Sequence, residues 1–117
     1  SLFENDSVVE KIIHYGAGSP RETLKIILNA FYEAEDDILD NKSIEEAQQM
    51  MSETIVKYLE ENEVTVLKDI HNDKNVLYSD VLANLLVKKI VLEYDNGQDK
   101  RINPLLLDND DFTNLLK

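Results

Sequence analysis

Apolar residues recur every three or four positions through most of the chain, a pattern typical of helices with one buried face. This pattern predicts helices over residues 5–15, 19–39, 43–59, 64–70 and 79–89. Two of the predicted helix starts carry a capping box, Ser19 with Glu22 and Ser43 with Glu46. The residues expected to face the core in the second helix are Leu24, Ile27, Leu28, Phe31 and Ala34.

The hydrophobic pattern changes after residue 89. Residues 90–94 are β-branched and aromatic and predict a strand, and Asn96-Gly97 predicts a hairpin turn within residues 95–99. Residues 100–103 then return as a second strand, which Pro104 ends, and a short helix closes the chain. The fold class is therefore mainly α: a helical bundle over residues 1–42, then a helix-turn-helix with a β-hairpin wing over 43–117.

The stretch from Gly16 to Glu22 joins the first two predicted helices. Its glycines suit a helix end, and Ser19 and Pro20 suit a helix start. Arg21 is different, because it lies in the first turn, where the helix dipole disfavours a positive charge by about 0.3–1 kcal/mol. Local structure does not require this arginine. We expect it either to serve an anion or to be an exposed arginine that pairs with Glu22 or with the acidic tail.

Composition narrows the possible functions. The 117 residues carry a net charge of −12, which repels the phosphate backbone of nucleic acids. The chain has no cysteine, which excludes disulfides and thiolate chemistry and is compatible with the reducing cytoplasm, where we place it. No stretch has the length of a membrane span, and no signal segment is visible. His14 and His71 have no ligand-spaced partner, so we expect no metal site.

Residues 18–31, Gly-Ser-Pro-Arg-Glu-Thr-Leu-Lys-Ile-Ile-Leu-Asn-Ala-Phe, resemble the lid of AAA+ ATPases. The shared pattern is a glycine-rich helix end, then Ser-Pro-Arg and an amphipathic helix with a late alanine. In the origin-initiator branch and its prokaryotic relatives a winged-helix domain follows the lid. Residues 85–106 look like that module, because a helix, a strand, an Asn-Gly turn and a second strand ending in Asn-Pro-Leu follow in order.

The resemblance implies that Arg21 is the sensor-2 residue, which reaches the γ-phosphate of ATP bound on an adjacent core domain. The sequence contains no Gly-x-x-x-x-Gly-Lys-Ser/Thr loop, so we expect no ATPase activity from this chain alone. ATP and magnesium would be bound only by a core domain that this chain lacks. We therefore expect the C-terminal lid and winged-helix portion of a larger ATPase, with its own N-terminal ATPase domain as the first partner.

The predicted winged helix also raises the question of DNA binding. The candidate contacts to nucleic acid or to a protein partner are Lys88, Lys89, Lys100 and Arg101. Acidic residues lie among them, and a recognition helix needs bases on its outer face, so protein contacts are favoured. The alternative functions are a free-standing winged-helix transcriptional regulator or an acidic protein-interaction module.

Overall fold

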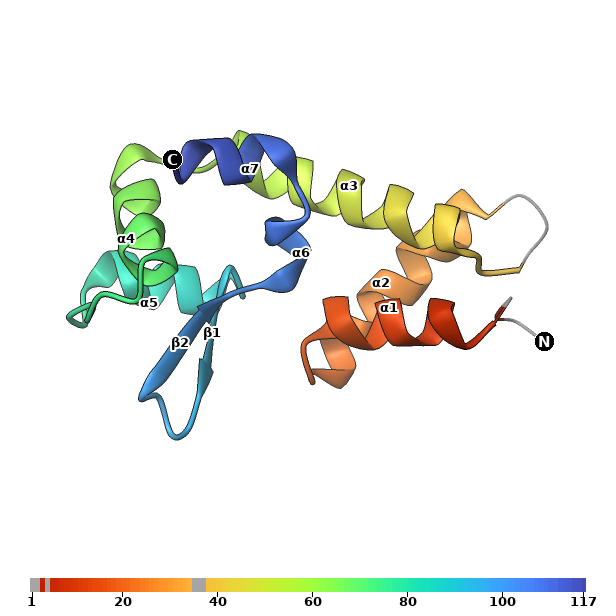
Figure 1. Ribbon diagram of the computed structural model, residues 1–117, viewed down its shortest axis with the longest axis horizontal. Coiled ribbons are helices and arrows are strands. Elements are labelled where there is room, and N and C mark those ends of the chain that lie inside the picture. Colours follow the sequence, from red (N-terminus) through yellow and green to blue (C-terminus); the bar gives the residue numbers. More distant parts are fainter. Residues whose placement is uncertain (1–2, 4, 35–37) are drawn as a thin grey trace. The chain divides into compact units, whose positions relative to one another are not determined.

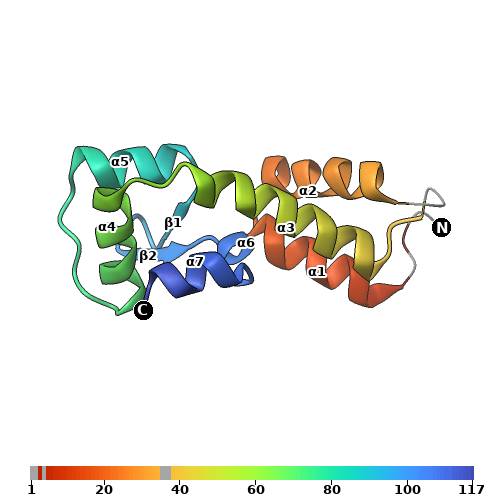
Figure 2. The same cartoon turned by 90° about the horizontal axis from the view of Figure 1, so that it is seen from above.

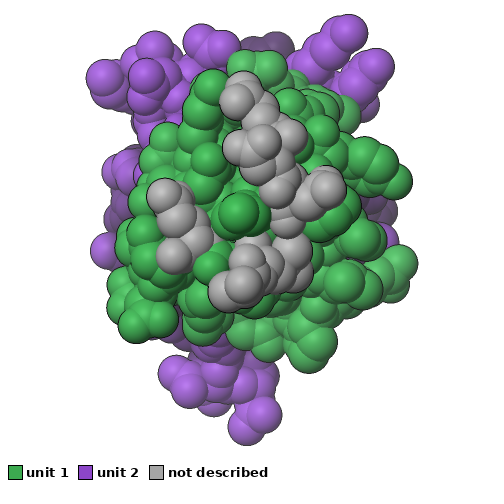
Figure 3. Space-filling model, turned by 90° about the vertical axis from the view of Figure 1, so that its right-hand side faces the viewer, with its two compact units in different colours: residues 1–54 green, residues 55–117 purple. Residues whose placement is uncertain are grey.

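A computed structural model describes residues 3, 5–34 and 38–117. The chain forms two compact units, residues 1–54 and 55–117, which Figure 3 distinguishes by colour. The first unit contains helix α1 (Asp6–Gly16), helix α2 (Pro20–Glu33) and most of helix α3 (Asn41–Lys57). The sequence placed a domain boundary after residue 42, at the start of α3, whereas the compact units divide inside α3; the functional boundary stays a prediction.

Polar caps begin the first two helices, and the cap at Ser19 is the one that the sequence predicts. The Asn5 side chain accepts a hydrogen bond from the Val8 N–H at 3.3 Å, and the Ser19 hydroxyl accepts one from the Glu22 N–H at 3.3 Å. Each bond satisfies one of the N–H groups that a helix start leaves unpaired. The buried apolar side chains of this unit are Val8, Ile12, Tyr15, Ile26, Ala30, Leu39, Ile44 and Ala47.

Helices α1 and α2 pack against each other (Figure 1). They approach closely at Gly16. A Cβ atom at Gly16 would lie 2.0 Å from the Thr23 hydroxyl and 3.0 Å from the Thr23 Cα. Ala17 follows in the left-handed conformation, with φ 50°, and turns the chain towards α2. Gly16 is thus required because a Cβ atom does not fit there. The chain reverses its direction at Ala17.

The prediction for the buried face of α2 is wrong for three of its five residues, since only Ile27 and Ala34 are partly buried. Leu24, Leu28 and Phe31 are 55%, 52% and 42% exposed, whereas Ile26 and Ala30 are buried. The contact at Gly16 explains the difference, because it fixes the side of α2 that carries Thr23 against α1, and Ile26 and Ala30 follow on that side. The helix also ends at Glu33 instead of near Leu39, since the backbone of Ala34 is extended.

Helix α3 begins earlier than predicted. Asp40 and Ser43 form a reciprocal pair: the Ser43 N–H donates to the Asp40 carboxylate at 2.7 Å, and the Asp40 N–H donates to the Ser43 hydroxyl at 3.1 Å. Glu46, expected to form a box with Ser43, lies instead 3.9 Å from the Lys42 amine. Asp40 therefore caps α3 in place of the predicted Ser43, and the helix begins at Asn41.

The second unit contains the end of α3, helix α4 (Glu61–His71), helix α5 (Asp80–Val87), strand β1 (Val91–Tyr94), strand β2 (Asp99–Ile102), helix α6 (Pro104–Leu107) and helix α7 (Asp110–Leu115). Figure 2 shows α4 and α5 side by side, and they pack against β2 and β1. The buried core residues are Leu67, Ile70, Leu82, Leu85, Ile90, Val91, Ile102, Leu106, Phe112 and Leu116. The described residues are mainly helical and contain an antiparallel hairpin, which confirms the predicted fold class.

Two local features of this unit differ from the prediction. Helix α4 starts at Glu61, before the predicted Val64, because Glu60 and Glu63 form a capping box. The hairpin pairs Val91 with Ile102 and Tyr94 with Asp99, so its loop spans residues 95–98. Asp95, Asn96 and Gly97 all have positive φ, which gives a four-residue loop around the predicted Asn-Gly pair.

Candidate functional site

Arg21 lies in the first turn of α2, as the sequence predicts, and its side chain is exposed. Among the residues that the structure describes, no carboxylate forms an ion pair with it. Glu22, its acidic neighbour, pairs instead with Lys25 at 3.3 Å. A guanidinium group without an internal partner, beside the positive end of a helix, is available to an anion from outside the unit.

Three of the four candidate bases of the second unit interact with groups of the same unit. The Lys88 amine lies 3.5 Å from the carboxylate of Glu63, which is buried at the start of α4. The Lys100 amine donates a hydrogen bond to the Gly97 carbonyl at 2.7 Å. Arg101 is the third and pairs with Asp99. Lys89 is exposed just after α5, with φ 62°, and forms no ion pair or hydrogen bond of this kind in the described part of the chain.

Arg101 is held on the hairpin by a carboxylate and an aromatic ring. Its guanidinium lies 2.7 Å from the Asp99 carboxylate and 5.4 Å from the centre of the Tyr94 ring. The hydrogen bond that the Arg101 guanidinium donates to the Asp99 carboxylate raises the pKa of Arg101. Glu93 and Asp95 add exposed negative charge to the same hairpin. The predicted wing is therefore not a basic surface that would attract phosphates.

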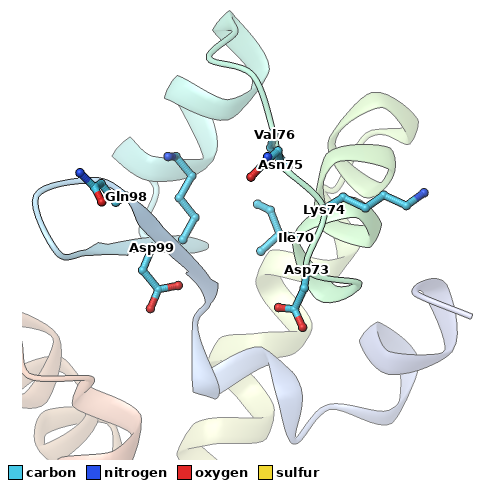
Figure 4. Close-up of a pocket in the computed structure, with 8 residues that line it drawn as sticks. Ile70, Asp73, Lys74, Asn75, Val76, Gln98 and Asp99 are labelled. Carbon is cyan, nitrogen blue, oxygen red and sulfur yellow. The ribbon is translucent and has the colours of Figure 1, made fainter.

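A small pocket lies between the hairpin and the loop after α4 (Figure 4). Its volume is about 170 Å³, and its lining includes Ile70, Asp73, Asn75, Asp99 and Lys100. In Figure 4 the Lys74 side chain points away from the hairpin, in agreement with its pairing to Asp69 at 3.8 Å. The carboxylates of the pocket and its buried apolar side chain, Ile70, do not form an arrangement that performs acid–base chemistry.

An apolar groove lies elsewhere in the second unit. Its volume is about 630 Å³, and the apolar part of its lining is Val56, Leu59, Val64 and Leu115. Glu61, Lys68 and Asp111 complete the lining with both signs of charge. The hydrophobic pattern does not predict this groove, because its lining comes from α3, α4, α7 and the turn between α3 and α4, which the pattern alone does not bring together.

The remaining candidate groups do not assemble into a metal site. Within residues 3, 5–34 and 38–117, no three histidine or acidic side chains lie close enough to hold a metal ion. Asp36 and Asp37 lie outside the described residues, and the Asp40 carboxylate caps α3. The Ser43 N–H and hydroxyl that bond to Asp40 lower the pKa of its carboxyl group.

Comparisons with models of protein families, with curated proteins and with solved structures find no match. The likeness to an AAA+ lid and winged helix consequently rests on the residues quoted above and stays a prediction. No helix of the described residues is long and apolar enough to cross a membrane.

Proposed function

We propose that this chain is a regulatory and structural portion of an AAA+-type ATPase, in which Arg21 senses nucleotide and the second unit contacts protein. The chain itself performs no catalysis in this proposal. ATP and magnesium are bound by a core domain outside residues 1–117, and the whole protein works in the cytoplasm.

The availability of Arg21 is the observation that carries the proposal. Its guanidinium is exposed and has no ion pair in the described part of the chain, although the protein carries twice as many acids as bases. The Ser19 cap satisfies the N–H of Glu22, and the helix start adds partial positive charge. A phosphate oxygen brought to this point would receive a charge-assisted bond from the guanidinium fork.

The paired bases of the second unit support protein contacts over DNA contacts. Lys88, Lys100 and Arg101 each interact with an oxygen of the same unit, so a phosphate would have to replace an existing partner. The outer positions of α5 include Asp80, and the hairpin is acidic. The apolar groove lined by Val56 and Leu115 offers the surface that a protein partner needs.

The test is nucleotide affinity in the protein encoded by the complete reading frame. Arg21→Ala should weaken ATP binding by about tenfold, the loss expected for one charge-assisted contact of about 1.4 kcal/mol. Lys25→Ala is the matched control, because Lys25 lies one turn further along α2 and already pairs with Glu22. Equal ATP affinity in the wild type and Arg21→Ala, or a reading frame without an ATPase domain, would refute the proposal.

A further inference from the structure

The exposed side of α2 is unusual for a helix of a chain this acidic. Leu24, Leu28 and Phe31 follow one another at helical spacing and are about half exposed, and Tyr32 beside them is 85% exposed. The two bases Arg21 and Lys25 lie on the same side, at the N-terminal half of the helix. We refer to these six residues, Arg21, Leu24, Lys25, Leu28, Phe31 and Tyr32, as the α2 face.

The α2 face lies opposite the side that packs on α1. At 100° per residue, the buried side of α2 is centred on Ile26 and Ala30, and Leu28 projects about 160° away from Ile26. No acidic residue belongs to the face, although acids outnumber bases two to one in the chain. An exposed apolar stripe with this composition marks a surface that contacts another molecule.

The order of residues along the face is self-complementary. Cations occupy its N-terminal half, and the aromatic rings of Phe31 and Tyr32 occupy its C-terminal half. A second α2 running antiparallel, with Leu28 near its own copy, would place each Arg21 near the partner's aromatic rings, where cation–π contact is favourable. Lys25 lies on the same face but pairs with Glu22 of its own helix. A parallel pair would instead bring Arg21 against Arg21.

The helix dipoles favour the same orientation. The last turn of α2 contains no basic residue, so its terminal carbonyl groups keep their partial negative charge. In the antiparallel pair the Arg21 of each copy lies near that end of the other helix. A twofold axis through the contact makes the two halves equivalent, which is the commonest symmetry of soluble dimers.

The available area indicates a weak dimer. Fully covered Phe and Tyr rings bury roughly 150–250 Å² each, so Phe31 and Tyr32 at their exposures of 42% and 85% offer roughly 200–300 Å² per chain. Two chains together bury twice this area, and Leu24 and Leu28 add to it. The total then approaches about 1,000 Å², the area at which specific interfaces begin. The net charge of −12 opposes association over long range, and physiological salt screens it beyond about 8 Å.

We infer that the α2 face is a homodimer interface, in which two copies of this chain pair antiparallel through α2 with Leu28 at the twofold axis. The argument for the dimer does not rest on the proposed nucleotide sensing. It uses the face on which Arg21 lies, so dimer formation and access of an anion to Arg21 compete.

Sedimentation equilibrium of the 117-residue chain tests the existence of the dimer. In about 150 mM salt the wild type should associate reversibly at concentrations on the order of 10–500 μM, as expected for a small interface. Leu28→Asp should raise the dissociation constant at least about tenfold, because it buries a carboxylate at the centre of the contact. Leu77→Asp is the matched control, since Leu77 is an exposed leucine of the second unit and its change should leave association unaltered.

Cysteine crosslinking tests the orientation, since the natural chain has no cysteine. Leu28→Cys should form an intermolecular disulfide readily. Leu24→Cys alone should not, because eight residues of axial offset separate two copies of position 24 by about 12 Å, beyond the about 7 Å that a disulfide spans. An equimolar mixture of Leu24→Cys and Tyr32→Cys should crosslink as a heterodimer. Circular dichroism confirms that each variant is folded.

The outcomes that overturn the inference are distinct. A wild type that stays monomeric to about 1 mM, which is above the whole range expected for the contact, excludes the dimer. Association that survives Leu28→Asp or disappears with Leu77→Asp places the contact elsewhere. Rapid disulfide formation by Leu24→Cys alone indicates a parallel pair and contradicts the register. Should Leu28→Asp fail to fold, the crosslinking pattern decides.

Discussion

Replacing Gly16 by alanine probes the contact that orients α2. The added Cβ would lie 2.0 Å from the Thr23 hydroxyl oxygen, 2.9 Å from its Cβ and 3.0 Å from its Cα. Rotation of the Thr23 side chain can move the hydroxyl but not the Cα or Cβ, so the two helices must separate. Overpacking of this kind costs about 1–3 kcal/mol.

Helix propensity partly offsets this cost. Alanine is favoured over glycine by about 1 kcal/mol inside a helix, and Gly16 is the last residue of α1. We therefore expect Gly16→Ala to lower the free energy of unfolding by about 1 kcal/mol, with 2 as the upper end. Urea denaturation followed by far-ultraviolet circular dichroism measures the change as a lower midpoint at unchanged slope.

A double-mutant cycle with Thr23→Ala distinguishes the clash from a backbone effect. Removing the Thr23 hydroxyl should recover part of the loss in Gly16→Ala, with a coupling of at least about 0.5 kcal/mol. The matched control is Gly18→Ala, where the new Cβ meets open space but φ is +80°. Its destabilisation should be independent of Thr23. A double-mutant cycle without coupling between positions 16 and 23 would refute the close contact.

Three further predictions concern a cap, a titration and a binding surface. Ala17→Gly should stabilise the chain by about 0.5–1 kcal/mol in the same urea assay, because the left-handed φ of 50° strains alanine and not glycine; an unchanged midpoint contradicts this. The Asp40 carboxyl group has a lowered pKa in the fold, so its contribution is present above the ordinary value of 3.8 and is lost as the pH falls through the folded value. Thermal melts should therefore show the wild type losing stability relative to Asp40→Asn as the pH falls towards 3, and a constant difference would count against the bond to Ser43. Gel-shift titration at about 50 mM salt should detect no DNA binding by the second unit's bases, and clear binding there would reverse the assignment of that surface.

The sequence predicts the helices well because their starts are local. Ser19 and Ser79 each bond to an N–H three residues ahead, and each begins a helix where expected. The face that α2 buries is not a local property. Both sides of this helix carry apolar residues, and the choice between them depends on the distance between Gly16 and Thr23, which lie on different helices.

The candidate site divides in the same way. The place of Arg21 follows from the local Ser-Pro start, and the pairing of Arg101 with Asp99 follows from their spacing of two on one strand, which puts both on the same face. The pairing of Lys88 with Glu63 joins residues 25 positions apart. This pairing depends on the packing of α5 against α4, so the sequence alone does not reveal that Lys88 has an acidic partner.

ATP turnover by the protein of the complete reading frame is the most direct test of the proposed function. The account predicts that Arg21→Ala lowers kcat/KM by at least about tenfold, the least expected when one cationic contact to a transferred phosphate is lost, and that Lys25→Ala leaves it unchanged. Equal turnover by the wild type and Arg21→Ala would contradict a nucleotide-sensing arginine.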